Sequence, residues 1–143
     1  MRCMLKILII DDDVAACQVL KESFARLGFK SKNVVTAEEG IEILKKEKFD
    51  VVFAALSARI NGGRSVARWI KNNNLDTYCF ITTSWKGELE TELLRNDGVH
   101  KVIHKPLTYN QIKAVLGESF LLPDTSKIVI PKNILHKNDK SQE

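Results

Sequence analysis

The chain has 143 residues, of which 44% are hydrophobic and 28% are charged. This composition favours one globular domain with a short appendage and excludes a disordered or collagen-like chain. The net charge is +4, but the basic residues are dispersed and not interleaved with aromatic residues, so nucleic-acid binding is not expected. The longest apolar run near the N-terminus, residues 5–10, is too short for a membrane span or a signal sequence. We therefore expect a cytoplasmic protein that has no contact with a membrane.

The first part of the chain alternates short apolar runs with segments whose apolar residues recur every three or four positions. The former are typical of strands covered on both faces, and the latter of amphipathic helices. In chain order they predict a strand at 6–10, a helix at 14–27, a strand at 33–35, a helix at 36–46 and a strand at 50–56. Gly28 is placed to cap the first helix, and Thr36 with Glu39 forms a capping box that opens the second.

The second part continues the same alternation. It predicts a helix at 64–71, a strand at 78–82, a helix that contains 89–94 and ends before Gly98, a strand at 99–104, and a helix at 108–116. Thr108 and Gln111 form a second capping box at the start of the last helix.

Strands that alternate with helices predict an α/β fold with a parallel sheet and right-handed crossovers. The functional residues of a doubly wound sheet lie in loops at the C-terminal ends of its strands. We expect the domain to cover residues 1–120. Residues 121–143 include two prolines and end in a polar run, so they are interpreted as a C-terminal extension.

Three consecutive carboxylates, Asp11, Asp12 and Asp13, follow the first predicted strand. Adjacent carboxylates are unfavourable in such a crevice unless a cation or hydrogen bonds compensate them, and magnesium is well suited to oxygen ligands. We interpret Asp11 and Asp12 as an acidic pocket and Asp13 as the helix cap. In the alternative interpretation, one aspartate caps the helix and the others only face solvent.

An ordered set of residues across about 4–118 resembles the receiver domains of bacterial two-component signalling. The set consists of the acidic run at 11–13, a hydroxyl residue at Thr83, and the pair Lys105-Pro106. The resemblance implies a flavodoxin-like, three-layer α/β/α fold with a doubly wound, five-stranded parallel sheet in the order 2-1-3-4-5. It also implies that Thr83 is a switch residue and that Pro106 follows a cis peptide bond.

In this family an aspartate at the end of the third strand accepts phosphate, and Ala55 aligns with that position. A methyl group cannot attack a phosphohistidine or bind magnesium. Asp50 lies at the other end of the same predicted strand, too far away to replace the missing acid. The resemblance therefore implies a degenerate receiver that is not phosphorylated, is not an enzyme and has no cofactor, with weak or absent magnesium binding at Asp12.

Of the other switch and pocket positions, one departs from the family pattern and one agrees with it. The aromatic residue that the family carries on its fifth strand aligns with Val102, so coupling by ring rotation is not expected. Lys105 is present, and without phosphate its ammonium group is expected to pair with Asp12 or Asp11.

The resemblance also implies a protein partner. The family usually docks its partners on the face formed by the fourth helix, the fifth strand and the fifth helix, and Trp85, Val102 and Tyr109 are expected near it. A homodimer is left open.

Two other functions stay open. One is a conventional, phosphorylated receiver whose acceptor has been assigned to the wrong position. The other is a small phosphatase similar to the haloacid dehalogenases, with Asp11 as nucleophile and Asp13 as general acid. Such an enzyme also needs an acidic pair after Lys105 to hold magnesium, and only isolated acidic residues follow it. A flavin carrier is disfavoured because three aspartates repel a phosphate group.

Overall fold

The computed structural model describes residues 4–57 and 62–120. Within these residues, five strands alternate with five helices. The first half contains β1 (Lys6–Ile10), α1 (Val14–Arg26), β2 (Lys30–Val34), α2 (Ala37–Lys46) and β3 (Val51–Ala55). The second half contains α3 (Gly62–Asn72), β4 (Tyr78–Thr83), α4 (Thr91–Asn96), β5 (Lys101–His104) and α5 (Tyr109–Ser119). Every strand pair is parallel and the strand order is β2-β1-β3-β4-β5, which confirms the predicted doubly wound fold.

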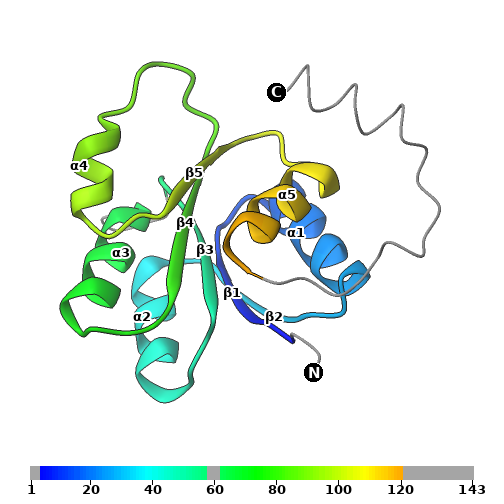
Figure 1. Cartoon of the computed structure of the whole chain (residues 1–143), viewed down its shortest axis with the longest axis horizontal. Helices are drawn as coiled ribbons and strands as arrows, with labels where there is room; N and C mark the ends of the chain where they lie inside the picture. Colours follow the sequence, from blue (N-terminus) through cyan, green and yellow to red (C-terminus); the bar gives the residue numbers. More distant parts are fainter. Residues whose placement is uncertain (1–3, 58–61, 121–143) are drawn as a thin grey trace.

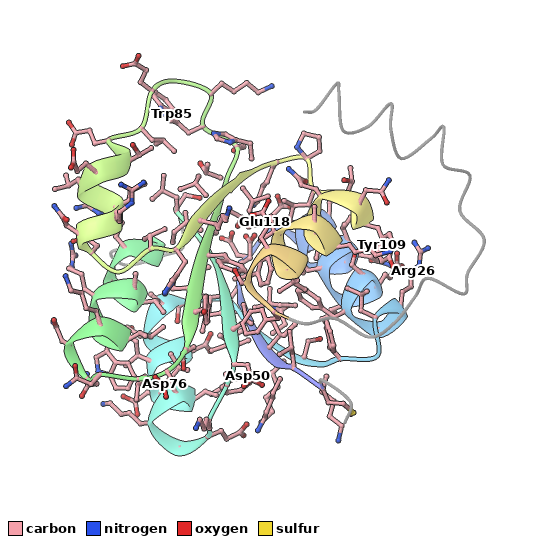
Figure 2. The ribbon with its side chains drawn as sticks, viewed as in Figure 1. Arg26, Asp50, Asp76, Trp85, Tyr109 and Glu118 are labelled. Carbon is pink, nitrogen blue, oxygen red and sulfur yellow. The ribbon has the colours of Figure 1, made fainter. Side chains whose placement is uncertain are left out.

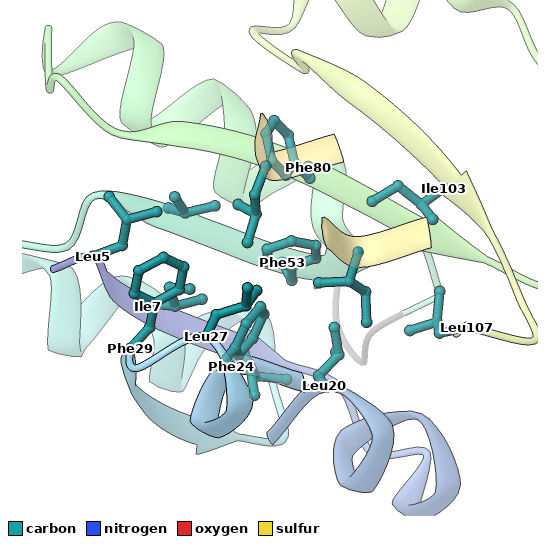
Figure 3. Packing of buried hydrophobic residues seen from close by; sticks show 14 of the residues in the cluster. Leu5, Ile7, Leu20, Phe24, Leu27, Phe29, Phe53, Phe80, Ile103 and Leu107 are labelled. Carbon is teal, nitrogen blue, oxygen red and sulfur yellow. The ribbon is translucent and has the colours of Figure 1, made fainter. Parts of the chain in front are cut away.

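Helices cover both faces of the sheet, with α1 and α5 on one face and α2, α3 and α4 on the other (Figure 1). The first core layer lies between the sheet and the helices α1 and α5, and Phe24, Phe53 and Phe80 pack together within it (Figure 3). The ring centroid of Phe53 lies 5.2 Å from each of the other two, in tilted and edge-on geometries that aromatic pairs favour. The second layer joins aliphatic strand residues to α2, α3 and α4.

Strand β3 shows how the sequence places the core. All five of its residues are buried, because the strand lies in the middle of a sheet that is covered on both faces. Val51 and Phe53 belong to the layer under α1 and α5, whereas Val52 and Ala54 belong to the opposite layer. This division follows from the two-residue repeat of a strand.

Strand β2 begins at Lys30, three residues earlier than predicted. It is an edge strand that pairs only with β1, and its residues are exposed or half-buried. Charged and polar residues are common on sheet edges, where they discourage pairing with other chains. The strand therefore lacks the apolar pattern from which the prediction was made.

The helix starts are determined largely by capping. Thr36 and Thr108 accept hydrogen bonds from the backbone N–H groups of Glu39 and Gln111, and both predicted capping boxes are complete. Helix α3 begins at Gly62, two residues earlier than expected, because the glycines that resemble a turn form its first residues. Helix α4 ends before Gly98 as predicted, but it begins at Thr91 and so does not include Leu89, and it has no side-chain cap.

The membrane prediction can be examined for part of the chain. None of the helices within residues 4–57 and 62–120 is both long and apolar enough to cross a membrane. Helix α5 ends at Ser119, close to the predicted end of the domain. The predicted extension at 121–143 lies outside the described residues.

Candidate functional site

The predicted site residues come from four strands that end at the same edge of the sheet. Asp11 directly follows β1, Ala55 is the last residue of β3, Thr83 is the last residue of β4, and Lys105 directly follows β5. Because all the strands are parallel, their C-terminal ends lie together. Ile10 pairs with Ala54 in the ladder between β1 and β3, so the next residues along, Asp11 and Ala55, lie at the same end of two adjacent strands.

Lys105 binds two of the three aspartates. Its Nζ atom lies 3.0 Å from Oδ2 of Asp11 and 3.1 Å from Oδ2 of Asp13. The Asp11 side chain is 2% exposed and the Lys105 side chain is 13% exposed, so this ion pair is largely shielded from solvent. Lys105 was predicted to pair with Asp12 or Asp11. Asp11 is found, but the second partner is Asp13 rather than Asp12.

Backbone hydrogen bonds orient the two carboxylates that hold Lys105. Oδ1 of Asp11 accepts the backbone N–H of Asp13 at 2.9 Å, and Oδ1 of Asp13 accepts the backbone N–H of Ala16 at 3.2 Å. Asp13 is therefore the predicted N-cap of α1. It also binds Lys105, a second role that was not predicted.

The charges in this cluster favour the ionised forms of Lys105 and Asp13. The backbone hydrogen bond from Ala16, followed by the hydrogen bond and charge of Lys105, lowers the pKa of Asp13. Burial opposes the charge of Lys105, but hydrogen bonds and charge interactions with Asp11 and Asp13 outweigh it and raise the Lys105 pKa. The cluster is thus a fixed network of two carboxylates around one ammonium group.

Asp12 lies next to this network, but its side chain is exposed. It lines a hollow of about 510 Å³ between the start of α1 and the end of β2, together with Asp11, Asn33 and Val35. This position agrees with the predicted acidic pocket, although the predicted metal-binding role of Asp12 stays a prediction.

The residues at this edge do not fit a magnesium ion well. Ala55 is 2% exposed and presents only a methyl group, while the Lys105 ammonium binds Asp11 and Asp13. Within residues 4–57 and 62–120, no group of three acidic, histidine or cysteine side chains is arranged to hold a metal. Asp50 lies at the opposite end of the sheet (Figure 2), where its Oδ2 accepts the backbone N–H of Lys6 at 2.9 Å.

The predicted switch positions surround the same edge. Thr83 is 6% exposed, and its Oγ1 accepts the backbone N–H of Trp85 at 3.0 Å. Val102 is half-buried and packs against the layer under α2, α3 and α4. The peptide bond between Lys105 and Pro106 is cis, as predicted. The hydrogen bond from Trp85 thus connects the Thr83 hydroxyl to the loop that leads into α4.

The response regulator receiver domain family matches residues 7–117 of the chain. The chain belongs to this family. The receiver is similar to the probable chemotaxis protein CheY of Rhizobium etli, with 24% identity over 119 residues that cover 81% of the chain and 92% of that relative. The family match and this relative confirm the CheY-like and two-component assignments.

Solved structures have the same fold as this receiver. The chemotaxis response regulator CheY4 of Vibrio cholerae superposes with a TM-score of 0.75 at 16% identity, covering 82% of this chain and 100% of that one. The receiver domain of a sensor histidine kinase from Pseudomonas aeruginosa superposes with a TM-score of 0.71 at 15% identity, covering 81% and 97%. In that structure a magnesium ion is coordinated in the active-site cleft.

Two of the predicted docking residues, Trp85 and Tyr109, have different surroundings in the receiver. Trp85 is 58% exposed, which agrees with a role in docking. Tyr109 instead packs toward α1, where the guanidinium carbon of Arg26 lies 3.7 Å from the centre of its ring. Figure 2 shows Tyr109 beside Arg26 and away from Trp85. Tyr109 begins α5, and the sequence spacing could not show that its ring turns toward α1.

Two interactions in the receiver were not predicted. His100 accepts the backbone N–H of Cys79 through Nδ1 at 3.0 Å, so an imidazole extends the pairing of β4 with the chain before β5. Asp97, at the end of α4, binds both Arg64 and Arg68 of α3 at 2.8 and 3.5 Å. The hydrogen bond between His100 and Cys79 could not be predicted, because no sequence pattern marks a histidine that accepts a backbone N–H. The two arginines share a helix face, but their partner is distant in sequence.

Proposed function

We propose that this receiver domain is a protein-interaction module of a two-component system and that aspartyl phosphorylation does not control it. The observation that carries the proposal is Ala55 at the end of β3, where the resemblance to receivers places the phosphate acceptor. A methyl group has no electron pair with which to attack phosphorus. The family assignment supports the signalling role, and the Ala55 side chain supports the loss of aspartyl phosphorylation.

The ion network supports a single resting arrangement. Lys105 is held by Asp11 and Asp13 at 3.0 and 3.1 Å, and breaking such a shielded pair is costly. We therefore propose that the domain is not an enzyme and needs no cofactor, with magnesium binding at Asp12 weak or absent.

The proposed docking surface lies on the side of the molecule that carries α4 and β5. Trp85, Val102 and Tyr109 are its candidate residues, and the Tyr109 ring also contacts Arg26 of α1. The proposed partner is a protein rather than nucleic acid, because the sequence has no run of basic residues interleaved with aromatic residues. A homodimer through this surface stays open, and the cytoplasmic location stays a prediction.

Phosphate labelling tests the proposal directly. The full chain is incubated with magnesium and either radiolabelled acetyl phosphate or a phosphorylated histidine kinase, with a phosphorylatable CheY protein as the positive control. We expect the control to be labelled and this chain to remain unlabelled. Stable label on any aspartate of the wild-type chain would reject the proposal and favour a conventional receiver.

The variant Ala55→Asp provides a matched gain-of-function comparison. It adds a carboxylate beside the acids at the end of β1, which increases the number of oxygen ligands available to a hard cation. We expect magnesium to raise the melting temperature of the variant but not that of the wild-type chain. An equal increase in both proteins would show that the natural site already binds the ion.

The phosphatase alternative is tested on the same samples. It requires Asp11 to attack a phosphate ester, but this side chain is 2% exposed and ion-paired with Lys105. We expect no hydrolysis of a generic phosphate ester. Hydrolysis that disappears in Asp11→Asn would favour the enzyme.

A further inference from the structure

Apolar side chains are exposed in the loop before α4 and on α4 itself. Trp85 is 58% exposed and Leu93 is 42% exposed. Figure 2 shows Trp85 in the loop that extends beyond the C-terminal edge of the sheet. Tryptophan is enriched at the energetic centres of protein interfaces, because it offers a large apolar area on a side chain with only two rotatable bonds.

The Trp85 side chain makes contacts within its own loop. Its indole Nε1–H donates to the carbonyl oxygen of Glu88 at 3.3 Å, and its backbone N–H donates to Oγ1 of Thr83 at 3.0 Å. The ring also covers Gly87 so closely that a Cβ atom there would lie 2.7 Å from it. An ordered side chain loses little conformational entropy on binding. The indole is therefore a preorganised anchor.

Carboxylates accompany the exposed apolar residues. Glu88, Glu90 and Glu92 are all exposed. Between Trp85 and Leu93 the sequence has these three glutamates and only one lysine, whereas the net charge of the whole chain is +4. Among the ion pairs of the described residues, none neutralises any of these three glutamates. The segment is thus locally acidic in a basic protein.

We infer that Trp85, Leu93 and the three glutamates, here called the acidic tryptophan surface, bind a cationic protein segment. The partner would place apolar residues on the indole and lysine or arginine residues against Glu88, Glu90 and Glu92. Opposite charges across an interface favour association and select the partner. The same carboxylates repel nucleic-acid backbones and anionic lipids. The inference rests on the proposed interaction role and specifies the chemistry of the partner.

Trp85 is exposed in the chain without phosphate, and its backbone is held by Thr83. The end of β4 holds the loop through the Thr83 hydroxyl, which is itself almost buried. The indole is consequently presented in the resting protein. Binding should therefore be measurable with the purified chain alone.

Two synthetic amphipathic peptides are suitable probes. They share one leucine stripe, but one carries lysine on its polar face and the other carries glutamate. Binding of each peptide to the full chain is measured by calorimetry at low and at high salt. We expect the lysine peptide to bind at least about tenfold more tightly than the glutamate peptide at low salt, with a smaller difference at high salt because surface charges are screened.

Three variants separate the contributions. Trp85→Ala should weaken binding of the lysine peptide by about tenfold or more. The double variant Glu88→Gln/Glu92→Gln should weaken it several-fold and reduce its salt dependence. Glu38→Gln/Glu42→Gln on α2 removes the same charge at the same spacing, and it should bind like the wild type.

Equal affinity for both peptides, or equal loss in the two glutamate double variants, would overturn the inference. The double variants keep the Glu88 carbonyl that holds the indole, so they test the charge even if Trp85→Ala does not fold. Phosphate labelling of the wild-type chain would reject the proposed function without affecting the peptide preference. Loss of that preference in an unlabelled chain would reject only the acidic tryptophan surface.

Discussion

Lys105 and Asp11 form an ion pair of 3.0 Å in which the carboxylate is almost completely buried. The pair connects the residue after β5 to the residue after β1, although β3 and β4 lie between these strands in the sheet. The same ammonium group also reaches Asp13, the cap of α1. One side chain therefore ties together two distant loops at the candidate site.

Lys105→Ala should destabilise the fold by about 3 kcal/mol, because it leaves the buried Asp11 carboxylate without its cation. Urea denaturation followed by circular dichroism measures the change. Lys101→Ala is the control, since its ion pair with Glu118 is exposed and should contribute less than about 1 kcal/mol. Equal losses in the two variants would contradict a structural role for the Lys105 network.

The charge of Asp13 should stabilise the fold over a defined pH range. Its pKa is lowered from 3.8, so its contribution is present above that value and is lost as the pH falls through the lowered pKa. The pKa of Lys105 is raised from 10.5, so its contribution is present below that value and is lost as the pH rises through the raised pKa.

Asp13→Asn isolates this effect because asparagine is also a good N-cap. We expect the wild type to have a higher urea midpoint than the variant between about pH 5 and pH 9. The difference should shrink at both extremes. A difference that stays constant from acid to alkaline pH would mean that the ion pair contributes nothing.

Gly62→Ala should be more destabilising than Gly28→Ala. Both glycines have positive φ angles, 65° and 85°, so an added side chain strains the backbone at either position. Only at Gly62 would the new Cβ also collide with protein, 2.1 Å from the carbonyl oxygen of Leu56. We expect a cost of about 1 kcal/mol at Gly28 and clearly more at Gly62. Equal costs in urea denaturation would show that the backbone before α3 yields easily.

Cys79 and Cys17 should resist alkylation in the folded chain. Burial raises the pKa of Cys79 to about 12, and burial followed by the charge of Asp11 raises that of Cys17. The thiolate is the reactive form, so iodoacetamide near neutral pH should leave both residues unmodified until urea is added. Peptide mass spectrometry follows each cysteine separately. Rapid modification of Cys79 in the native protein would contradict its burial.

The fold could be predicted best where a local sequence pattern corresponds to a single local structure. The capping boxes at Thr36 and Thr108 are complete in the structure, because they depend only on residues three positions apart. The alternation of buried runs and amphipathic segments likewise predicted the parallel sheet. Strand β2 was predicted too short, because an exposed edge strand has no apolar pattern.

Side-chain directions in the candidate site were less accessible to sequence reasoning. The meeting of Asp11 and Lys105 could be expected from the strand order, but the choice of Asp13 over Asp12 depends on how the chain turns into α1. The contact between Tyr109 and Arg26 depends in the same way on the rotation of α5 relative to α1. Such rotations are set by packing between elements, which the sequence spacing does not record.

The ammonium group beside Asp11 is attached to the polypeptide by its own side chain. Unlike a dissolved ion, it cannot diffuse away, and chelators or dilution cannot remove it. Every copy of the chain carries this ammonium group from its synthesis. The cation that compensates the buried Asp11 carboxylate is therefore encoded in the amino-acid sequence.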